Sequence, residues 1–207
     1  MNRTINRRKL LGTGAAMVAV AALPARAFAQ ASPLSDTERS ILEIAKREVE
    51  RAGEALWRKD VAGIADFGVH SSQPRFHFAN LESGTVRSFL VAHGSGSDPD
   101  HTGWLTDFSN EFGSNATSRG AYVTWEWYKG QYGTSVRLGG LDPDNSNAFP
   151  RAIVMHSADY ATAAHVARWG RLGRSNGCFA MGPEDFREAL WNLSGGRLLY
   201  ADRLGLA

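Results

Sequence analysis

The sequence predicts a mainly β domain with a few helices, in the α+β class. Apolar and polar residues alternate over stretches that begin near Arg75 and near Ala121, and this period of two is typical of half-buried strands. The three- and four-residue apolar period of a helix appears after Asp36 and again after Pro183. Clusters of glycine, aspartate and asparagine separate these stretches and predict the turns between them.

Residues 1–29 are predicted to be an export signal that is removed from the mature protein. They contain no acidic residue, and four basic residues precede an apolar run over 10–23. This run is shorter than the roughly 20 residues that a membrane-spanning helix needs. Residues 27–29 (Ala-Phe-Ala) supply a small-x-small cleavage site, and Arg7 with Arg8 resembles a twin-arginine export signal. We therefore expect a periplasmic protein, with no stable membrane insertion once the signal is removed.

The composition of the mature chain limits its partners. Cleavage after Ala29 leaves 18 basic and 21 acidic residues, a formal charge of −3, so no nucleic-acid partner is expected. A chain of this length suits one compact unit, which we expect to be a monomer without a cofactor. It comprises an N-terminal helix and connection over residues 30–72, packing on a main domain over 73–207. The only cysteine, Cys178, cannot form an internal disulfide, so its thiol is either buried and inert or a nucleophile.

The segment over 30–72 is predicted to begin with a helix. Ser35 and Glu38 have the spacing of a capping box, in which each side chain accepts a hydrogen bond from a free N–H group at the helix start. Apolar residues then recur at spacings of three and four up to about Trp57 and form one buried face. Residues 60–72 are irregular and spotted with glycine, which predicts a connection without regular structure.

The main domain is predicted to start with two hairpins. The first has strands over 75–81 and 86–93, and the second has strands over 121–128 and 133–138. Between them, the polar stretch over 93–115 is predicted to be a long loop. Loops of this length inside a compact domain are usually functional or disordered.

A short apolar strand over 151–155 is predicted to deliver His156 and Ser157 at its end. In the sequence, a histidine at a strand end thus precedes the glycine-rich segment 170–177 that leads to Cys178. The remaining predicted elements are a short helix over 162–169, a helix that begins at Pro183 and a final strand over 197–200.

The residues around Cys178 point to cysteine acyl transfer. Gly170, Gly173 and Gly177 precede the cysteine, and glycine allows tight turns whose backbone N–H groups can bind an oxyanion. A free cysteine has a pKa near 8.5, so it needs a base or a cation to become a nucleophile at neutral pH. His156 lies 22 positions before Cys178. It can act as this base only if a strand end and a returning loop bring the two residues together.

These residues match a known family. His156 and Ser157, followed by residues 175–178 (Ser-Asn-Gly-Cys), resemble the catalytic motif of the L,D-transpeptidases, the YkuD-type cysteine enzymes of bacterial cell walls. The likeness fits the murein L,D-transpeptidase catalytic domain subfamily and extends over roughly 75–200. It implies a YkuD-like domain of β-sandwich or barrel-like form, and it makes 73–207 a catalytic domain that transfers acyl groups between peptidoglycan stem peptides. The other matching blocks are residues 91–94, 108–110, 136–141 and 151–154.

The resemblance also implies roles for single residues. Cys178 would attack the carbonyl before a terminal D-residue and form a thioester, while His156 would take the thiol proton and return it to the leaving D-alanine. Ser157 would orient this histidine. The backbone N–H groups of Asn176, Gly177 and Cys178 would stabilise the oxyanion. The residues themselves, and not the resemblance, suggest that His93 lines a cleft, because it stands at a strand end before a glycine-rich loop, and that Arg174 could hold a substrate carboxylate. The candidates for substrate binding are His93, Gly94, Arg174 and Ser175.

Two positions depart from the pattern of the wider family. Ala180 stands where many members carry an arginine, two residues after the cysteine, and Asn176 stands where many carry a histidine. The missing arginine leaves open how the substrate is held and whether the acceptor is a second stem peptide.

Three other interpretations stay open. The same dyad can use water as the acceptor, which would make the protein an L,D-carboxypeptidase or an amidase acting on peptidoglycan. A catalytically silent peptidoglycan-binding module would keep the fold without the chemistry. A zinc site is the third, although the sequence has no close-spaced pair of ligands to support it. The possible zinc ligands are His93, His101, His156 and Cys178.

Overall fold

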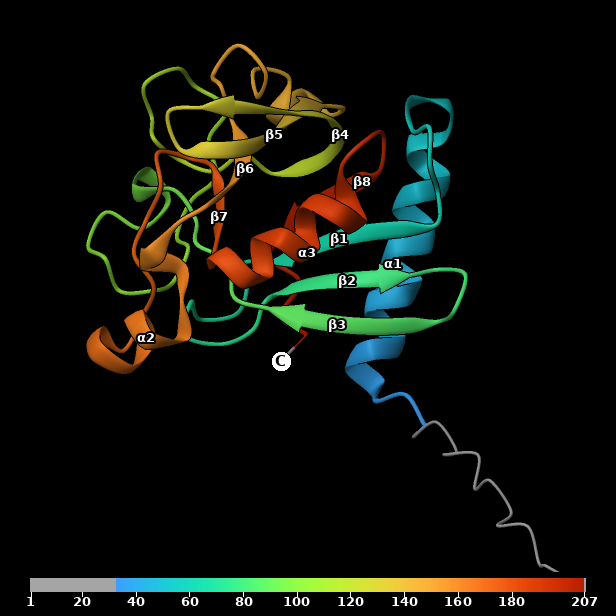
Figure 1. The fold of residues 1–207 in the computed structure, drawn as a ribbon, viewed down its shortest axis with the longest axis horizontal. Helices are drawn as coiled ribbons and strands as arrows, with labels where there is room; N and C mark the ends of the chain where they lie inside the picture. The colour runs from blue at the N-terminus through green and yellow to red at the C-terminus, as the bar shows by residue number, and fades with distance from the viewer. Residues whose placement is uncertain (1–32, 207) are drawn as a thin grey trace, which may run out of the picture. The chain divides into compact units, whose positions relative to one another are not determined.

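The computed structural model describes residues 33–206, which are built around a single eight-stranded sheet (Figure 1). The export signal predicted over 1–29 lies outside the described residues. Across the sheet the strands follow the order β3-β2-β1-β8-β4-β5-β6-β7. The strands are β1 (Val61–Asp66), β2 (Phe76–Asn80), β3 (Thr85–Phe89), β4 (Gly120–Gly130), β5 (Gly133–Gly140), β6 (Val154–Ser157), β7 (Phe179–Met181) and β8 (Leu198–Asp202). The α-helices of this part of the chain are α1 (Asp36–Ala52), α2 (Ala163–Trp169) and α3 (Pro183–Leu193).

The two ends of the strand order meet. β3 and β7 are the outermost strands. Just after β3, the Ala92 N–H donates to the Ala180 carbonyl of β7 at 2.8 Å, and Gly94 forms a bridge with Ser175. Because these contacts join the segment after one outer strand to the other outer strand, the sheet curls back on itself. The predicted mainly β, barrel-like fold with a few helices is confirmed.

Helices α1 and α3 cover opposite faces of the strands around β1. The capping box is present, since Glu38 N–H donates to Ser35 Oγ at 3.1 Å and Ser35 N–H donates to Glu38 Oε2 at 2.8 Å. Helix α1 ends at Ala52, short of the predicted Trp57, because Gly53 adopts a φ of 51°. Among residues 33–206, no helix combines the length and the apolar character needed to cross a bilayer. The residues of α1 that pack on the sheet are Ile41, Leu42, Ala45 and Val49.

The sequence predicted an irregular connection over residues 60–72, and this prediction is wrong. These residues contain β1, which pairs with β2 on one side and β8 on the other and is buried along its whole length. Its two faces are covered by α1 and α3, so both are apolar and no alternation marks the strand. Gly63 is required there, because a Cβ would lie 2.8 Å from Leu193 Cδ1 and 2.8 Å from Phe76 Cζ. The glycine that suggested a loop is therefore a packing requirement.

Two predicted strands have different ends. The strand predicted over 86–93 stops at Phe89. The strand predicted over 151–155 starts only at Val154, because the chain turns at Ala152, whose φ is 56°. β7, with three residues, was too short for its pattern to be recognised. The other predicted strands and the two later helices are present, with ends that differ by one or two residues where the sequence specified them.

Replacing Ser35 with alanine tests the helix start. Ser35→Ala removes the side-chain acceptor of the Glu38 N–H and should lower the free energy of unfolding by about 1 kcal/mol. Ser35→Asp keeps an acceptor at this position and should leave the stability close to that of the wild type. Urea unfolding measures both. Equal stability of Ser35→Ala and the wild type would contradict this account of the helix start.

Candidate active site

Strands β6 and β7 bring the predicted nucleophile and base to the same face of the sheet. They run parallel, with Met155 opposite Phe179 and His156 opposite Ala180. Side chains alternate between the two faces along a strand, so Cys178, two residues before Ala180, shares a face with His156. The other face is turned into the core, where Met155 and Phe179 are fully buried. Tertiary pairing thus closes the gap of 22 positions in the sequence.

The dyad lies in the wall of a cavity of about 200 Å³. Five predicted site residues meet there. Ser157 lines a neighbouring cavity beside α3. Two tyrosines in the wall, Tyr132 and Tyr160, were not predicted, because nothing in the local sequence sets them apart from core or surface aromatics. The predicted residues in the wall are His156, Arg174, Ser175, Asn176 and Cys178.

The thiol of Cys178 is largely buried, with 7% of the residue exposed. Its Sγ atom faces the carbonyl oxygen of Ala152 at 3.7 Å, so the S–H group donates to backbone. Burial raises the pKa of Cys178, while the backbone N–H of Val154 and the charge of Arg151 act in the opposite direction. The net effect is upward, and the resting sulfur is a protonated thiol.

The imidazole of His156 is held in one tautomer. Its Nδ1 atom lies 3.0 Å from the Ser157 carbonyl oxygen, which can only accept, so Nδ1 carries the proton and Nε2 has the free lone pair. Burial lowers the pKa of His156, although the bond to Ser157 favours the charged form. The ring of Tyr132 stacks on the imidazole at 4.7 Å with an interplanar angle of 22°. A neutral imidazole and a neutral thiol in the wall of one cavity are suited to general-base activation.

The loop before the nucleophile is tied by Ser175. Its Oγ donates to the Cys178 carbonyl at 2.6 Å and accepts the Gly177 N–H at 3.2 Å. The Gly177 N–H, to which the resemblance gave a role at the oxyanion, is therefore directed at Ser175 in this structure. Gly177 has a φ of 109°, and a Cβ there would lie 2.7 Å from the Ala116 carbonyl oxygen. Only glycine fits this turn.

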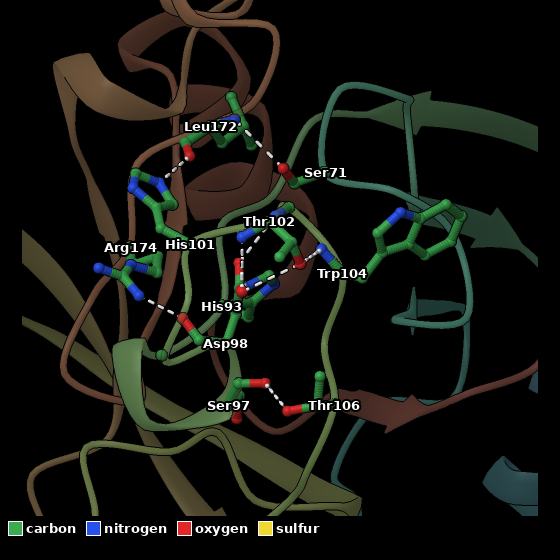
Figure 2. Close-up of polar contacts among 12 residues, drawn as sticks. Ser71, His93, Ser97, Asp98, His101, Thr102, Trp104, Thr106, Leu172 and Arg174 are labelled. Atoms are coloured by element: carbon green, nitrogen blue, oxygen red, sulfur yellow. Dashed lines mark hydrogen bonds and ion pairs between the residues drawn. The ribbon is translucent and has the colours of Figure 1, made fainter.

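The predicted substrate-binding residues occupy three kinds of position. Arg174 reaches the cavity wall and also donates to the carbonyl oxygens of Asp98 and Pro99, as Figure 2 shows for Asp98. Ser175 lines the cavity. His93 is 1% exposed and Gly94 is buried, so both lie behind the Cys178 loop and outside the cavity wall. The sequence suggested a cleft because a glycine-rich loop follows His93, but this segment closes the curled sheet.

The four possible zinc ligands are not gathered into one site. Across the described part of the chain, no three or more His, Cys, Asp or Glu side chains are grouped so that they could hold a metal ion. His101, for example, bonds through Nε2 to the Leu172 carbonyl oxygen at 2.9 Å.

Comparison with known proteins identifies the family. A family model described as "L,D-transpeptidase catalytic domain" matches residues 35–201. The chain belongs to the L,D-transpeptidase catalytic domain family. No curated protein sequence matches it.

Several solved L,D-transpeptidases are similar to this family member. The enzyme from Mycobacterium smegmatis is 16% identical, with 69% of this chain and 58% of that chain covered and a TM-score of 0.42. An L,D-transpeptidase from Mycobacterium tuberculosis H37Rv is 15% identical, with 69% and 57% covered and a TM-score of 0.45. One from Stackebrandtia nassauensis is 13% identical, with 79% and 68% covered and a TM-score of 0.41. The chain thus spans less than two thirds of the two mycobacterial proteins.

In this L,D-transpeptidase domain, the position two residues after the cysteine has no room for an arginine. Ala180 is fully buried and packs with Ala92, Ala161 and Leu172. A cation from another segment, Arg151, favours the thiolate form of Cys178 through its charge and so lowers the pKa of this thiol. The guanidinium of Arg151 is held by residues 109–118, with hydrogen bonds to Ser109 O at 2.8 Å, Ser118 Oγ at 2.7 Å, Ser114 Oγ at 3.1 Å and Ala116 O at 2.7 Å.

The raised pKa of Cys178 predicts a distinct pH profile for alkylation. Iodoacetamide reacts with the thiolate, so in the free protein its rate should be low at pH 7 and rise through an apparent pKa above the ordinary cysteine value of about 8.5. Arg151→Met removes a charge that favours the thiolate and should move this pKa further upward. Mass spectrometry of the alkylated single cysteine measures both. An apparent pKa below 7 in the wild type would indicate a resting thiolate instead.

Proposed function

We propose that this chain is an exported cysteine L,D-transpeptidase that acts on peptidoglycan stem peptides. The observation that carries the proposal is the position of Cys178 and His156 in one cavity, with the lone pair of His156 Nε2 free to accept a proton. Membership of the L,D-transpeptidase catalytic domain family supports the same chemistry. The dyad supplies the nucleophile and the base that acyl transfer needs.

In the first half-reaction, Cys178 Sγ attacks the carbonyl carbon that precedes the terminal D-residue of the donor peptide. Nε2 of His156 takes the thiol proton, and the backbone N–H groups of Asn176 and Cys178 stabilise the oxyanion, since the Gly177 N–H is bonded to Ser175. When the tetrahedral intermediate collapses, the protonated imidazole gives this proton to the leaving amine. D-alanine departs and a thioester remains on the sulfur.

In the second half-reaction, the amine of another stem peptide attacks the thioester carbonyl. The neutral imidazole takes the amine proton, and the sulfur leaves and regains a proton from the imidazole. The cavity, at about 200 Å³, is smaller than the roughly 300–1,000 Å³ typical of pockets that enclose a whole small ligand. It therefore receives the reacting end of a peptide, and the rest of the muropeptide lies outside it.

Product masses test the reaction. Incubation of the mature chain with disaccharide-tetrapeptides should give a dimer that lacks one D-alanine. Cys178→Ala should abolish product, and His156→Ala should lower the rate about 10²- to 10⁴-fold because the general base is lost. His165→Ala, on α2 outside the cavity wall, is the matched control and should retain activity.

Two other outcomes separate the alternatives. A tripeptide monomer as the only product would identify water as the acceptor and make the protein a hydrolase. A similar L,D-transpeptidase, LdtMt1, has been solved in complex with imipenem. Imipenem should therefore add its mass to the wild-type chain and leave Cys178→Ala unmodified. Binding to peptidoglycan without any adduct or product would support a silent module.

Export through residues 1–29 belongs to the same proposal, since peptidoglycan lies outside the cytoplasm. When the full-length chain is expressed in cells, the product in the periplasmic fraction should begin at Gln30, because cleavage after Ala29 removes the signal. Replacing both Arg7 and Arg8 with lysine should retain the chain inside the cell if the twin-arginine route is used. Immunoblotting of cell fractions measures this, with a single Arg26→Lys variant as the control. Unchanged export of the double variant would rule out the twin-arginine route.

A further inference from the structure

A buried network behind the Cys178 loop begins at Arg75. This arginine is fully buried, and burial lowers its pKa to about 9, so the guanidinium stays charged at neutral pH. Two of its nitrogens donate to the Val91 carbonyl at 3.0 and 2.9 Å, and a third donates to the Val69 carbonyl at 2.9 Å. Its Nη2 also lies 2.7 Å from Nδ1 of His93. Because a guanidinium only donates, Nδ1 of His93 is the acceptor in this pair.

His93 also bonds to Asp98 through its other ring nitrogen. With Nδ1 accepting, the proton of the neutral ring sits on Nε2, which donates to Asp98 Oδ2 at 3.3 Å. Burial and, to a smaller extent, the charge of Arg75 lower the pKa of His93 to about 3, so the ring is neutral at physiological pH. A buried cation and a buried anion are therefore bridged by a neutral imidazole in a single tautomer.

Asp98 is the other fixed end of the network. Burial by itself raises the pKa of this carboxyl, but the backbone N–H groups of Thr102 and Gly103, at 2.7 and 2.8 Å, hold it below its ordinary value. Figure 2 shows Thr102 and His93 on either side of this carboxylate. A fully bonded chain of this kind specifies one arrangement, because moving any member leaves a buried charge unpaired.

The segment that carries this network is bonded to the loop before Cys178. Ser175 N–H donates to the His93 carbonyl at 2.9 Å, and Ser95 N–H donates to the Ser175 carbonyl at 2.7 Å. Further along, Arg174 donates to the carbonyl oxygen of Asp98, a contact drawn in Figure 2. Ser175 in turn holds the Cys178 carbonyl at 2.6 Å. The path from the network to the nucleophile thus consists of consecutive hydrogen bonds.

Close packing leaves this path little freedom. A Cβ on Gly94 would lie 2.2 Å from the Asn115 carbonyl oxygen and 2.7 Å from Gly177 Cα, so the two backbones are in direct contact. A shift of the segment around His93 must therefore displace the turn at Gly177, one residue before the nucleophile.

We propose that Arg75, His93 and Asp98 form a positioning network that sets the place of Cys178 relative to His156. None of the three side chains lines the active-site cavity, so they act through the loop they hold and not on the substrate. The inference rests on the proposed role of Cys178 as the nucleophile.

Three histidine variants test the positioning role. His93→Leu removes both contacts, whereas His93→Gln offers one acceptor and one donor in place of the two ring nitrogens. His77→Leu is the matched control. His77 is also buried, but it lies on β2 and bonds to Ser88 on the neighbouring strand β3, so it is not part of the network. The readouts are thermal unfolding, kcat and KM with disaccharide-tetrapeptides, and the pH profile of iodoacetamide alkylation.

His93→Leu should lower kcat about 100-fold, with KM changed far less, since a misplacement near 1 Å costs about this much. Its alkylation profile should shift along the pH axis. His93→Gln should recover most of kcat, and His77→Leu should lose thermal stability while it keeps kcat and the wild-type pH profile. Folded His93→Leu with wild-type kcat and profile, or equal changes in His93→Leu and His77→Leu, would overturn the inference.

A second variant covers the case in which His93→Leu does not fold. Asp98→Asn keeps the size of the side chain and one acceptor oxygen but removes the charge faced by His93 Nε2 and by the backbone N–H groups of Thr102 and Gly103. It should lower kcat in the same direction by a smaller factor, and an unchanged kcat would count against the network.

Failure of the proposed function gives a different result. In that case the wild type forms no imipenem adduct and no product, while the alkylation profiles of the wild type and His93→Leu still decide whether the network positions Cys178.

Discussion

The parallel pairing of β6 with β7 is the constraint on which the site depends. A slip of one residue would turn Cys178 into the core and an apolar neighbour toward the cavity, because side chains alternate between the two faces. The register is held by Met155, Phe179 and Met181, all fully buried on the opposite face. The position of the thiol and the imidazole in one cavity wall is therefore a result of apolar burial beneath them.

Buried polar groups lie on both sides of the Cys178 loop, and they behave differently. On the cavity side, burial raises the pKa of Cys178 and lowers that of His156, so both groups are neutral at neutral pH. On the other side, Arg75 and Asp98 stay charged and are joined by a neutral His93. The two groups in the cavity wall are thus neutral, whereas the groups behind the loop include a buried cation and a buried anion.

The N-terminal part of the chain supports the site through the sheet. The family match begins at residue 35, the N-cap of α1, and so includes this helix. α1 and α3 enclose β1 from both faces, and β1 lies between β2 and β8. β2 and β3 then lead into the segment around His93, which meets β7 and closes the curled sheet. β2 and β3 lie far from β7 in the strand order, but the segment that follows β3 contacts the Cys178 loop because the sheet closes on itself.

The sequence by itself determined several local elements and the candidate residues of the site: the capping box at Ser35, the alternation that marks β4 and β5, and a cysteine with a histidine upstream. These depend on residue type and short spacing, which a sequence displays directly. Only the tertiary structure decided that β1 is a central strand, that Tyr132 stacks on the histidine, and that His93 lies behind the loop. Each of these depends on contacts with segments that are distant in the chain. Local periodicity does not show which other element will cover a given residue.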